Sequence, residues 1–365
     1  MFDIPVHLLR FRAEVTSPLR LPTAAGAALR GALFEALRQQ FCLAGRGPEC
    51  GQPAAAAECP VCFLLAPVAA GNPRGQDVPR PYVLRLPTDA PVLYSPGQTL
   101  EFGLATVGRA LGVFPYALLG VQEMGARGLG AGRGGSFRLS EVWAENPLLD
   151  QQERIYRAAD RQVQMPALPI DAAQVAAVAA ALAARLAPSG SQTPVGPPGP
   201  TQDSALSIQH AVLGTQPSAE RGALTIQHFG PPARLGLTLR TPTRLVEAGR
   251  LVKPVGFQLP TLLARLLERL DALGAQYGDG PTDAEPAALL RQAEAVRIVE
   301  RRLVWRELFR ASGRHGRLLP MGGLVGEVVL EGNVEPLLPW LVWGTLVHVG
   351  KDAAMGNGAF TFEAL

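Results

Sequence analysis

The chain has 365 residues, 47% of them hydrophobic, which is enough for two ordinary domains with a core each. The formal net charge of +3 does not by itself indicate nucleic acid, although of the 34 lysine and arginine residues only Lys253 and Lys351 are lysine. No apolar run reaches the ~18–20 residues that span a bilayer and no signal-peptide core is evident, so we expect a cytoplasmic protein with no membrane partner, whose cysteines are reduced or metal-bound.

The first half begins with a predicted strand and helix. Apolar and charged side chains alternate along Val6–Val15, which is typical of a half-buried strand. Leucine then recurs every fourth residue within Thr23–Gln40, which predicts a helix. A glycine-rich run, Gly125–Phe137, leads into the strand-like piece SFRLSEVW.

A connector separates the two halves. We place it at residues 145–231, with an alanine-rich helix capped by Asp171 and a Pro/Gly-rich flexible loop at 187–205. Its SIQHAV and TIQHFG pieces predict a hairpin that contains His210 and His228.

The second half repeats the layout of the first. Residues 234–240 alternate as in a strand, and a leucine-rich helix follows that we expect to end at Gly274. We interpret the arginine-rich residues 297–310 as a further helix, and the glycine-rich run His348–Phe360 precedes the strand-like AFTFEAL. The repeated layout predicts an α+β protein with two tandem ferredoxin-like (RRM-like) domains, at residues 1–144 and 232–365.

The two glycine-rich runs predict loops that bind an anion. Gly130, Gly132 and Gly135 fit the spacing G-x-G-x-x-G, but a strand follows where a dinucleotide site needs a helix. Lys351 is followed by Asp352, so a Walker A hydroxyl is missing. What remains is a loop whose backbone N–H groups can approach an anion beside cationic side chains, or simply a tight turn.

The cysteines form a separate group. Cys42, Cys50, Cys59 and Cys62 are the only four in the chain, and the last two form C-x-x-C, a half-site for tetrahedral zinc. The spacing predicts a structural zinc site, with four free thiols as the alternative.

Several segments resemble the CRISPR precursor-crRNA-processing endoribonucleases of the RAMP superfamily. The C-terminal run MGGLVGEVVLEGNVEPLLPWLVWGTLVHVGKDAAMGNGAF is similar to that family's last segment, and LTLRTPTRLVEAGRL, LLERLDALGAQYG and LVWRELFRASGRHGR are similar to its second domain. In the first half LRGALFEALRQQFC, CPVCF, YSPGQTLEFGLATVG and GLGAGRGGSFRLSEV match in the family's usual order. The resemblance covers nearly the whole chain apart from the connector.

The resemblance implies tandem ferredoxin-like domains that bind CRISPR repeat RNA. It also implies a metal-independent cut in which the ribose 2′-hydroxyl attacks the adjacent phosphate, leaving a 2′,3′-cyclic phosphate and a 5′-hydroxyl. The family often takes a histidine from the first helix, where this sequence has none and Glu35 stands near the expected place. Two alternatives therefore stay open: a non-catalytic crRNA-binding subunit of a CRISPR ribonucleoprotein, with other effector subunits as partners, and a zinc-stapled interaction scaffold.

The candidate site residues are mainly cations and glycines. A general base, a general acid and a cation near the phosphorane are needed for this reaction, so His348, His315 and Arg38 are the catalytic candidates. We expect no cofactor for catalysis, and His7 to be structural. The candidate RNA-binding residues are Arg30, Arg127, Gly128, Gly130, Gly132, Arg133, Arg310, Arg314, Gly350, Lys351, Gly356 and Gly358.

Overall fold

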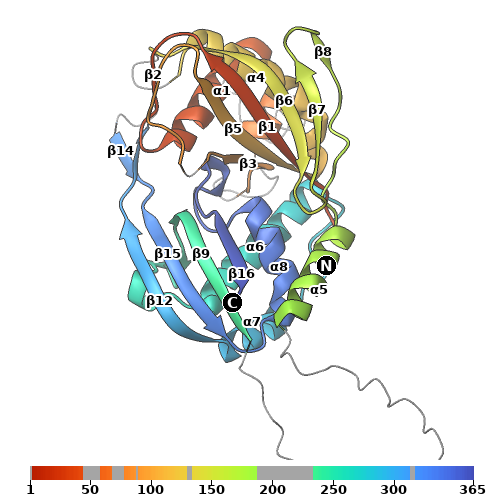
Figure 1. The fold of residues 1–365 in the computed structure, drawn as a ribbon, viewed down its shortest axis with the longest axis vertical. Coiled ribbons are helices and arrows are strands. Elements are labelled where there is room, and N and C mark those ends of the chain that lie inside the picture. Colours follow the sequence, from red (N-terminus) through yellow and green to blue (C-terminus); the bar gives the residue numbers. More distant parts are fainter. Residues whose placement is uncertain are drawn as a thin grey trace, which may run out of the picture.

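The computed structural model consists of two α+β units, one above the other in Figure 1. It describes residues 2–43, 58–67, 78–87, 89–129, 134–186, 233–312 and 317–365. The predicted hairpin with His210 and His228 lies outside these residues, as does the loop at 187–205.

The first unit has the predicted ferredoxin-like order of elements. Its six main elements are β1 (Val6–Val15), α1 (Ala25–Phe41), β3 (Tyr82–Arg85), β5 (Thr99–Val107), α4 (Phe114–Arg127) and β6 (Phe137–Asn146). The four strands lie in the order β3-β5-β1-β6 and are antiparallel, and α1 and α4 pack on one face. Smaller elements join them: β2 (Leu19–Arg20), α3 (Pro60–Leu65), β4 (Leu93–Tyr94) and η1 (Gly108–Val113).

The first sheet continues past the predicted boundary at residue 144. Strands β7 (Gln151–Arg157) and β8 (Gln162–Val163) extend it beyond β6, so the connector prediction was wrong for these residues. The alanine-rich helix α5 (Ala172–Leu186) begins as predicted, because Oδ1 of Asp171 accepts the backbone N–H of Gln174 at 2.9 Å.

The second unit repeats the same topology. Its six main elements are β9 (Arg234–Thr243), α6 (Leu259–Tyr277), β12 (Arg297–Arg306), β15 (Gly323–Glu331), α8 (Leu338–Val347) and β16 (Phe360–Ala364). The strands lie in the order β12-β15-β9-β16, which is the first unit's order. The remaining elements are β10 (Val246–Glu247), β11 (Arg250–Leu251), η3 (Pro254–Gly256), α7 (Pro286–Ala295), β13 (Phe309–Ser312), β14 (Arg317–Pro320), η4 (Glu335–Leu337) and η5 (Ala353–Met355).

Two predictions about these elements were wrong. Residues 297–310 form the edge strand β12 and the start of β13 instead of a helix, and β12 pairs with β15 along its length. Exposed charges are common on edge strands because they discourage pairing with another chain. Helix α6 runs on to Tyr277, so Gly274 lies within it and does not end it. Glycine is needed at this position for space, because a Cβ would lie 2.5 Å from the Gly280 carbonyl oxygen.

The core of the second unit extends into the first unit, which also has a core cluster of its own. The N-terminal segment of the first unit carries Phe2, Ile4 and Val6 into the same buried cluster as the leucines of α6 and α8. Phe2 packs edge-to-face on Trp343, with ring centroids 4.8 Å apart. Tyr277 donates its hydroxyl proton to the Pro79 carbonyl at 2.8 Å, which joins α6 to the first unit. Within the described ranges, no helix combines the length and the apolar character that a membrane crossing requires.

Candidate nucleic-acid interface

The two glycine-rich loops occupy equivalent places, because each joins the second helix of its unit to the last strand: α4 to β6, and α8 to β16. The loop at 348–359 folds back on its own unit through backbone hydrogen bonds. The N–H groups of His348, Val349, Lys351, Met355, Gly356, Gly358 and Ala359 all donate to protein acceptors. The predicted backbone cradle for an anion is therefore largely closed from within, which leaves the side chains to bind a ligand.

The glycines of this loop are needed for close packing. Gly350, Gly356 and Gly358 have φ values of 85°, 88° and 73°. A Cβ on Gly358 would lie 1.8 Å from the Val349 carbonyl oxygen, and one on Gly356 would lie 2.8 Å from that of Leu84 in β3. The loop is thus wedged against the first unit.

The first loop is described only at its ends. Gly128 ends α4, with φ 93° and its N–H bonded to the Met124 carbonyl at 3.1 Å. Arg127 pairs with Glu123 one turn earlier and contacts Gln39 of α1, so a carboxylate already balances its charge. Gly130, Gly132 and Arg133 lie outside the described residues.

Cations from both units gather where α1, β13 and the loop at 348–359 meet. We call this cluster the cationic junction, and it consists of Arg30, Arg80, Arg244, Arg310 and Lys351 around Asp352. The four charges that act most strongly on Asp352 are the cations Arg310, Arg244, Lys351 and Arg80. Burial raises the pKa of Asp352, and the surrounding cations oppose that rise.

Backbone carbonyl groups accept hydrogen bonds from three arginines of the junction. Arg30 Nη2 and Arg80 Nε both donate to the Leu65 carbonyl, at 3.3 and 3.1 Å. Arg244 Nη1 donates to the Gly322 carbonyl at 3.0 Å, and the Lys351 N–H donates to the Arg244 carbonyl at 3.0 Å. The Lys351 side chain itself is exposed.

A small apolar cluster fixes the arrangement of the three segments. It joins Ala24 before α1, Leu308 and Met321 at the base of the β13–β14 hairpin, and Met355 of η5. In Figure 1 the hairpin rises along the side of the molecule toward the first unit. The cluster therefore brings Arg310 beside the loop that carries Lys351.

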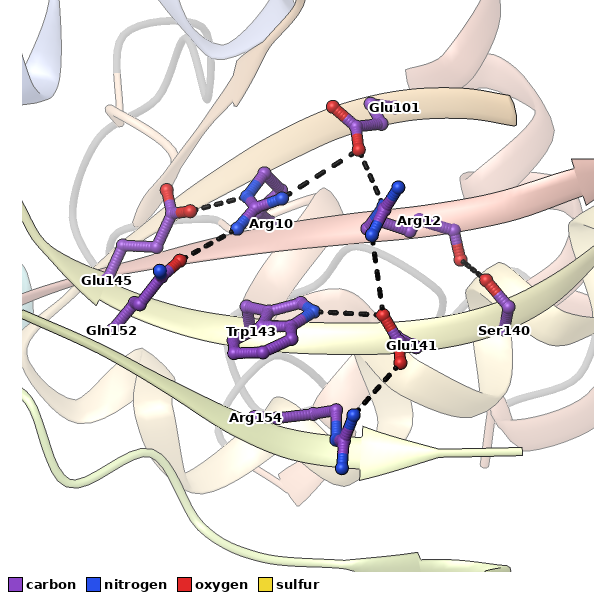
Figure 2. A network of polar contacts seen from close by, with 9 residues as sticks. All are labelled: Arg10, Arg12, Glu101, Ser140, Glu141, Trp143, Glu145, Gln152 and Arg154. Carbon is purple, nitrogen blue, oxygen red and sulfur yellow. Dashed lines mark hydrogen bonds and ion pairs between the residues drawn. The ribbon is translucent and has the colours of Figure 1, made fainter. Parts of the chain in front are cut away.

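The open face of the first sheet carries a polar network whose charges balance one another (Figure 2). The network joins Arg10, Arg12 and Arg154 to Glu101, Glu141 and Glu145. Trp143 lies between two of these guanidinium groups, with Arg10 at 5.7 Å and Arg154 at 5.5 Å from its ring centroid. A phosphate would have to displace a glutamate here, whereas the cationic junction offers five cations for its one carboxylate.

The structure places His348 away from solvent. It is 3% exposed, and its Nδ1 lies 3.2 Å from the Asn357 carbonyl. Burial, followed by the charges of Arg85 and Arg269, lowers the pKa of His348 to about 3. A neutral ring without solvent access has no path to a scissile phosphate in this conformation, which contradicts its catalytic assignment. His7 is also buried, as expected, and burial lowers its pKa.

The other catalytic candidates are spread more widely. Arg38 stacks on Phe34 of its own helix, 5.9 Å from the ring centroid, about 12 Å along the axis from Arg30. Glu35 is half-buried on α1, beside Gln39. His315 and Arg314 lie outside the described residues, between Ser312 and Arg317.

Three of the four cysteines come together. The sulfur atoms of Cys42, Cys59 and Cys62 all lie within 4.8 Å of one another, and Cys50 lies outside the described residues. Three thiols at this separation can hold a metal ion.

Arg80, Arg244 and Asp352 were not singled out from the sequence. Arg244 follows the strand-like stretch LTLRTPT, and Arg80 stands alone among prolines, so neither shows a spacing pattern. Only the meeting of the two units reveals that they share a site with Arg310 and Lys351.

Two family models match the chain, one in each half. A family model for the CRISPR-associated endoribonuclease Cas6 matches residues 237–360, and a model described as an N-terminal domain (AF_1859_N) matches residues 4–168. The comparison with curated proteins finds no significant match.

Solved structures share the fold over the whole chain. A Cas6 product complex has a TM-score of 0.50 and 16% identity, with 99% of each chain covered. A partial Cas6-RT-Cas1–Cas2 complex has a TM-score of 0.54 and 12% identity over 100% of this chain. The present chain spans 47% of that relative, and 30% of the chain in a further Cas6-RT-Cas1–Cas2 complex. A Cas6 family model thus matches the second unit, and solved Cas6 structures share the two-unit fold of the whole chain.

Proposed function

We propose that the cationic junction binds the backbone of CRISPR repeat RNA and that the chain processes precursor crRNA as an endoribonuclease. The observation that carries this proposal is the excess of cations: four, drawn from both units, act on the carboxylate of Asp352, and a fifth, Arg30, acts on Arg80 among them. Guanidinium groups pair with phosphate through two parallel hydrogen bonds, and Lys351 adds a mobile point charge. The match of the second unit to the Cas6 endoribonuclease model supports the same substrate.

The proposed reaction needs no metal ion. The 2′-hydroxyl attacks the adjacent phosphorus, the bond to the 5′-oxygen breaks, and the products are a 2′,3′-cyclic phosphate and a 5′-hydroxyl. Cations of the junction stabilise the charge of the phosphorane. Asp352 and His315 are the candidates for proton transfer, because Asp352 titrates within the junction and His315 belongs by sequence to the β13–β14 connection.

Cleavage can be tested with a labelled repeat RNA in EDTA, beside the same RNA with a 2′-deoxy substitution at the cut site. We expect cleavage of the all-ribose RNA alone, with a 2′,3′-cyclic phosphate detected by mass spectrometry. Cleavage of the 2′-deoxy substrate, or a requirement for a divalent ion, would contradict the proposed chemistry.

Binding at the junction can be tested with Lys351→Ala and Arg310→Ala. Each should weaken RNA binding by about 1–3 kcal/mol, or roughly 5- to 150-fold. Each should also lower the slope of log K against log salt by ~0.7, the value for one lost phosphate contact on a single strand. Arg302→Ala is the matched control, because Arg302 is 73% exposed and already paired with Glu300. Equal effects of all three substitutions would place the RNA elsewhere.

A second function is a non-catalytic subunit that holds crRNA within a larger CRISPR assembly. It is favoured by one observation: α1 carries Glu35 and no histidine, while His7 and His348, the histidines of the described residues, are both buried. Salt-sensitive binding of repeat RNA without cleavage would support this function over the first.

A further inference from the structure

Three cysteine sulfur atoms converge where α1 ends and α3 begins. Cys42 follows the last residue of α1, Cys59 precedes α3, and Cys62 lies in its first turn. The sulfur atoms of Cys42 and Cys59 are 4.0 Å apart, and all three lie within 4.8 Å of one another. Tetrahedral zinc, with Zn–S bonds of ~2.3 Å, sets its thiolates roughly 3.8 Å apart, whereas a disulfide needs about 2.05 Å. The spacing fits ligands of one ion rather than a covalent pair.

The backbone around Cys59 is arranged to stabilise a thiolate. Backbone groups of Cys62, Leu43 and Val61 and the Cys62 thiol form hydrogen bonds with the Cys59 sulfur. The backbone donors come from both sides of the site, since Leu43 follows α1 and the other two belong to α3. Because metal ligands are deprotonated thiols, such donors favour the metal-bound form.

We infer that Cys42, Cys59 and Cys62 bind one zinc ion as a structural staple between α1 and α3. Both Cys59 and Cys62 are 1% exposed, which leaves no open face for a substrate.

The staple bears directly on the cationic junction. The last residue of α3, Leu65, offers the carbonyl oxygen that accepts hydrogen bonds from both Arg30 and Arg80. Helix α3 is only six residues long; its buried side chains hold it to the core, and the metal would tie it directly to the end of α1. Loss of the metal should therefore release both arginines from their positions. This consequence, unlike the metal site itself, rests on the proposed function.

The metal site can be tested without RNA. Full-length protein, purified without a histidine tag under reducing conditions, should contain about one zinc per chain by inductively coupled plasma mass spectrometry. Its cobalt-substituted form should show the intense visible bands of a tetrahedral thiolate site. Cys59→Ser and Cys42→Ser should lose the zinc, whereas Leu64→Ala, which removes a buried contact of α3 without touching a sulfur, should keep it.

A second measurement tests whether loss of the metal weakens RNA binding. Cys59→Ser should weaken binding of repeat RNA and lower its salt slope by ~1.4, as expected if two phosphate contacts are lost. Arg30→Ala combined with Arg80→Ala in zinc-loaded protein should reproduce both effects. Leu64→Ala should change them less.

Three results would overturn the inference. They are a wild-type protein without zinc and with four free thiols, a disulfide detected by mass spectrometry, and unchanged zinc content in Cys59→Ser. Zinc bound as expected in a protein that fails to bind RNA would overturn the proposed function and leave the metal site standing.

Discussion

His348 illustrates how burial turns a candidate base into a structural residue. Because its pKa falls to about 3 on folding, the folded state binds fewer protons than the unfolded state below pH ~6.5. The stability that depends on the neutral ring is therefore present above that pH and is lost as pH falls toward 3. His348→Asn, which keeps a donor near the Asn357 carbonyl, should remove this dependence.

The test compares urea unfolding of the two proteins at pH 7 and pH 4. Wild type should lose a few kcal/mol more than His348→Asn over this interval, since each pKa unit corresponds to about 1.4 kcal/mol. Carboxylates elsewhere titrate in both proteins and cancel in the comparison. Parallel losses of stability would mean that His348 is not buried in the neutral form.

The pKa of Asp352 shifts in the opposite direction to that of His348. Its pKa is raised, so its charged form is penalised in the folded protein, and the penalty disappears as pH falls below that pKa. Asp352→Asn should therefore keep or raise stability at pH 7, the more so because asparagine accepts the αL conformation at φ 63°.

The same substitution should tighten RNA binding, by about 1 kcal/mol, because a negative charge leaves a phosphate site. If Asp352 is instead the proton carrier of the reaction, cleavage should fall while binding tightens. Fluorescence anisotropy and single-turnover cleavage, measured together, separate the two roles. Weaker binding would contradict the placement of RNA at the cationic junction.

At the scale of elements, the loop at 348–359 depends on glycine for space rather than for mobility. Gly358→Ala forces a Cβ within 1.8 Å of the Val349 carbonyl oxygen, so the loop must shift, and we expect a loss above ~4 kcal/mol. Gly249→Ala is the matched control: its φ is also positive, 78°, but no atom lies within 4 Å of the added Cβ. The control should cost only the conformational term, about 1–2 kcal/mol.

Denaturant unfolding of both variants checks this prediction. Similar, small losses of stability in the two proteins would show that the loop can shift easily to make room for the added Cβ. A large loss in Gly358→Ala alone would identify the loop as a rigid wedge between the units.

The elements that sequence predicted well are those with one buried face. Strands β1 and β9 alternate in sequence because the helices of their unit cover a single side, and their apolar side chains, such as Phe11 and Leu237, are buried. Edge strand β12 was missed because most of its side chains are exposed and charged, which hides the period of two.

The candidate site was predictable only in part. Arg30, Arg310 and Lys351 do lie at the junction, but Arg80 and Arg244 reach it through tertiary contacts that no local spacing records. The packing role of the glycines could not be predicted for the same reason. Their positive φ can be foreseen from sequence, but the backbone atoms packed against them belong to distant segments, so the sequence alone indicates anion binding.

At the scale of the whole molecule, the core cluster that contains residues of both units predicts that the two units unfold together. Phe2 belongs to the first unit by sequence but is fully buried against Trp343 of the second, so Phe2→Ala should cost about 3–5 kcal/mol. Hydrogen exchange followed by mass spectrometry should show this loss equally in peptides from α1 and from α6, because one cooperative transition exposes both. Two independent domains would instead confine the loss to the second unit and leave α1 at its wild-type protection. A loss confined in this way would also argue against the proposed RNA site, because the cationic junction needs both units in fixed positions relative to each other.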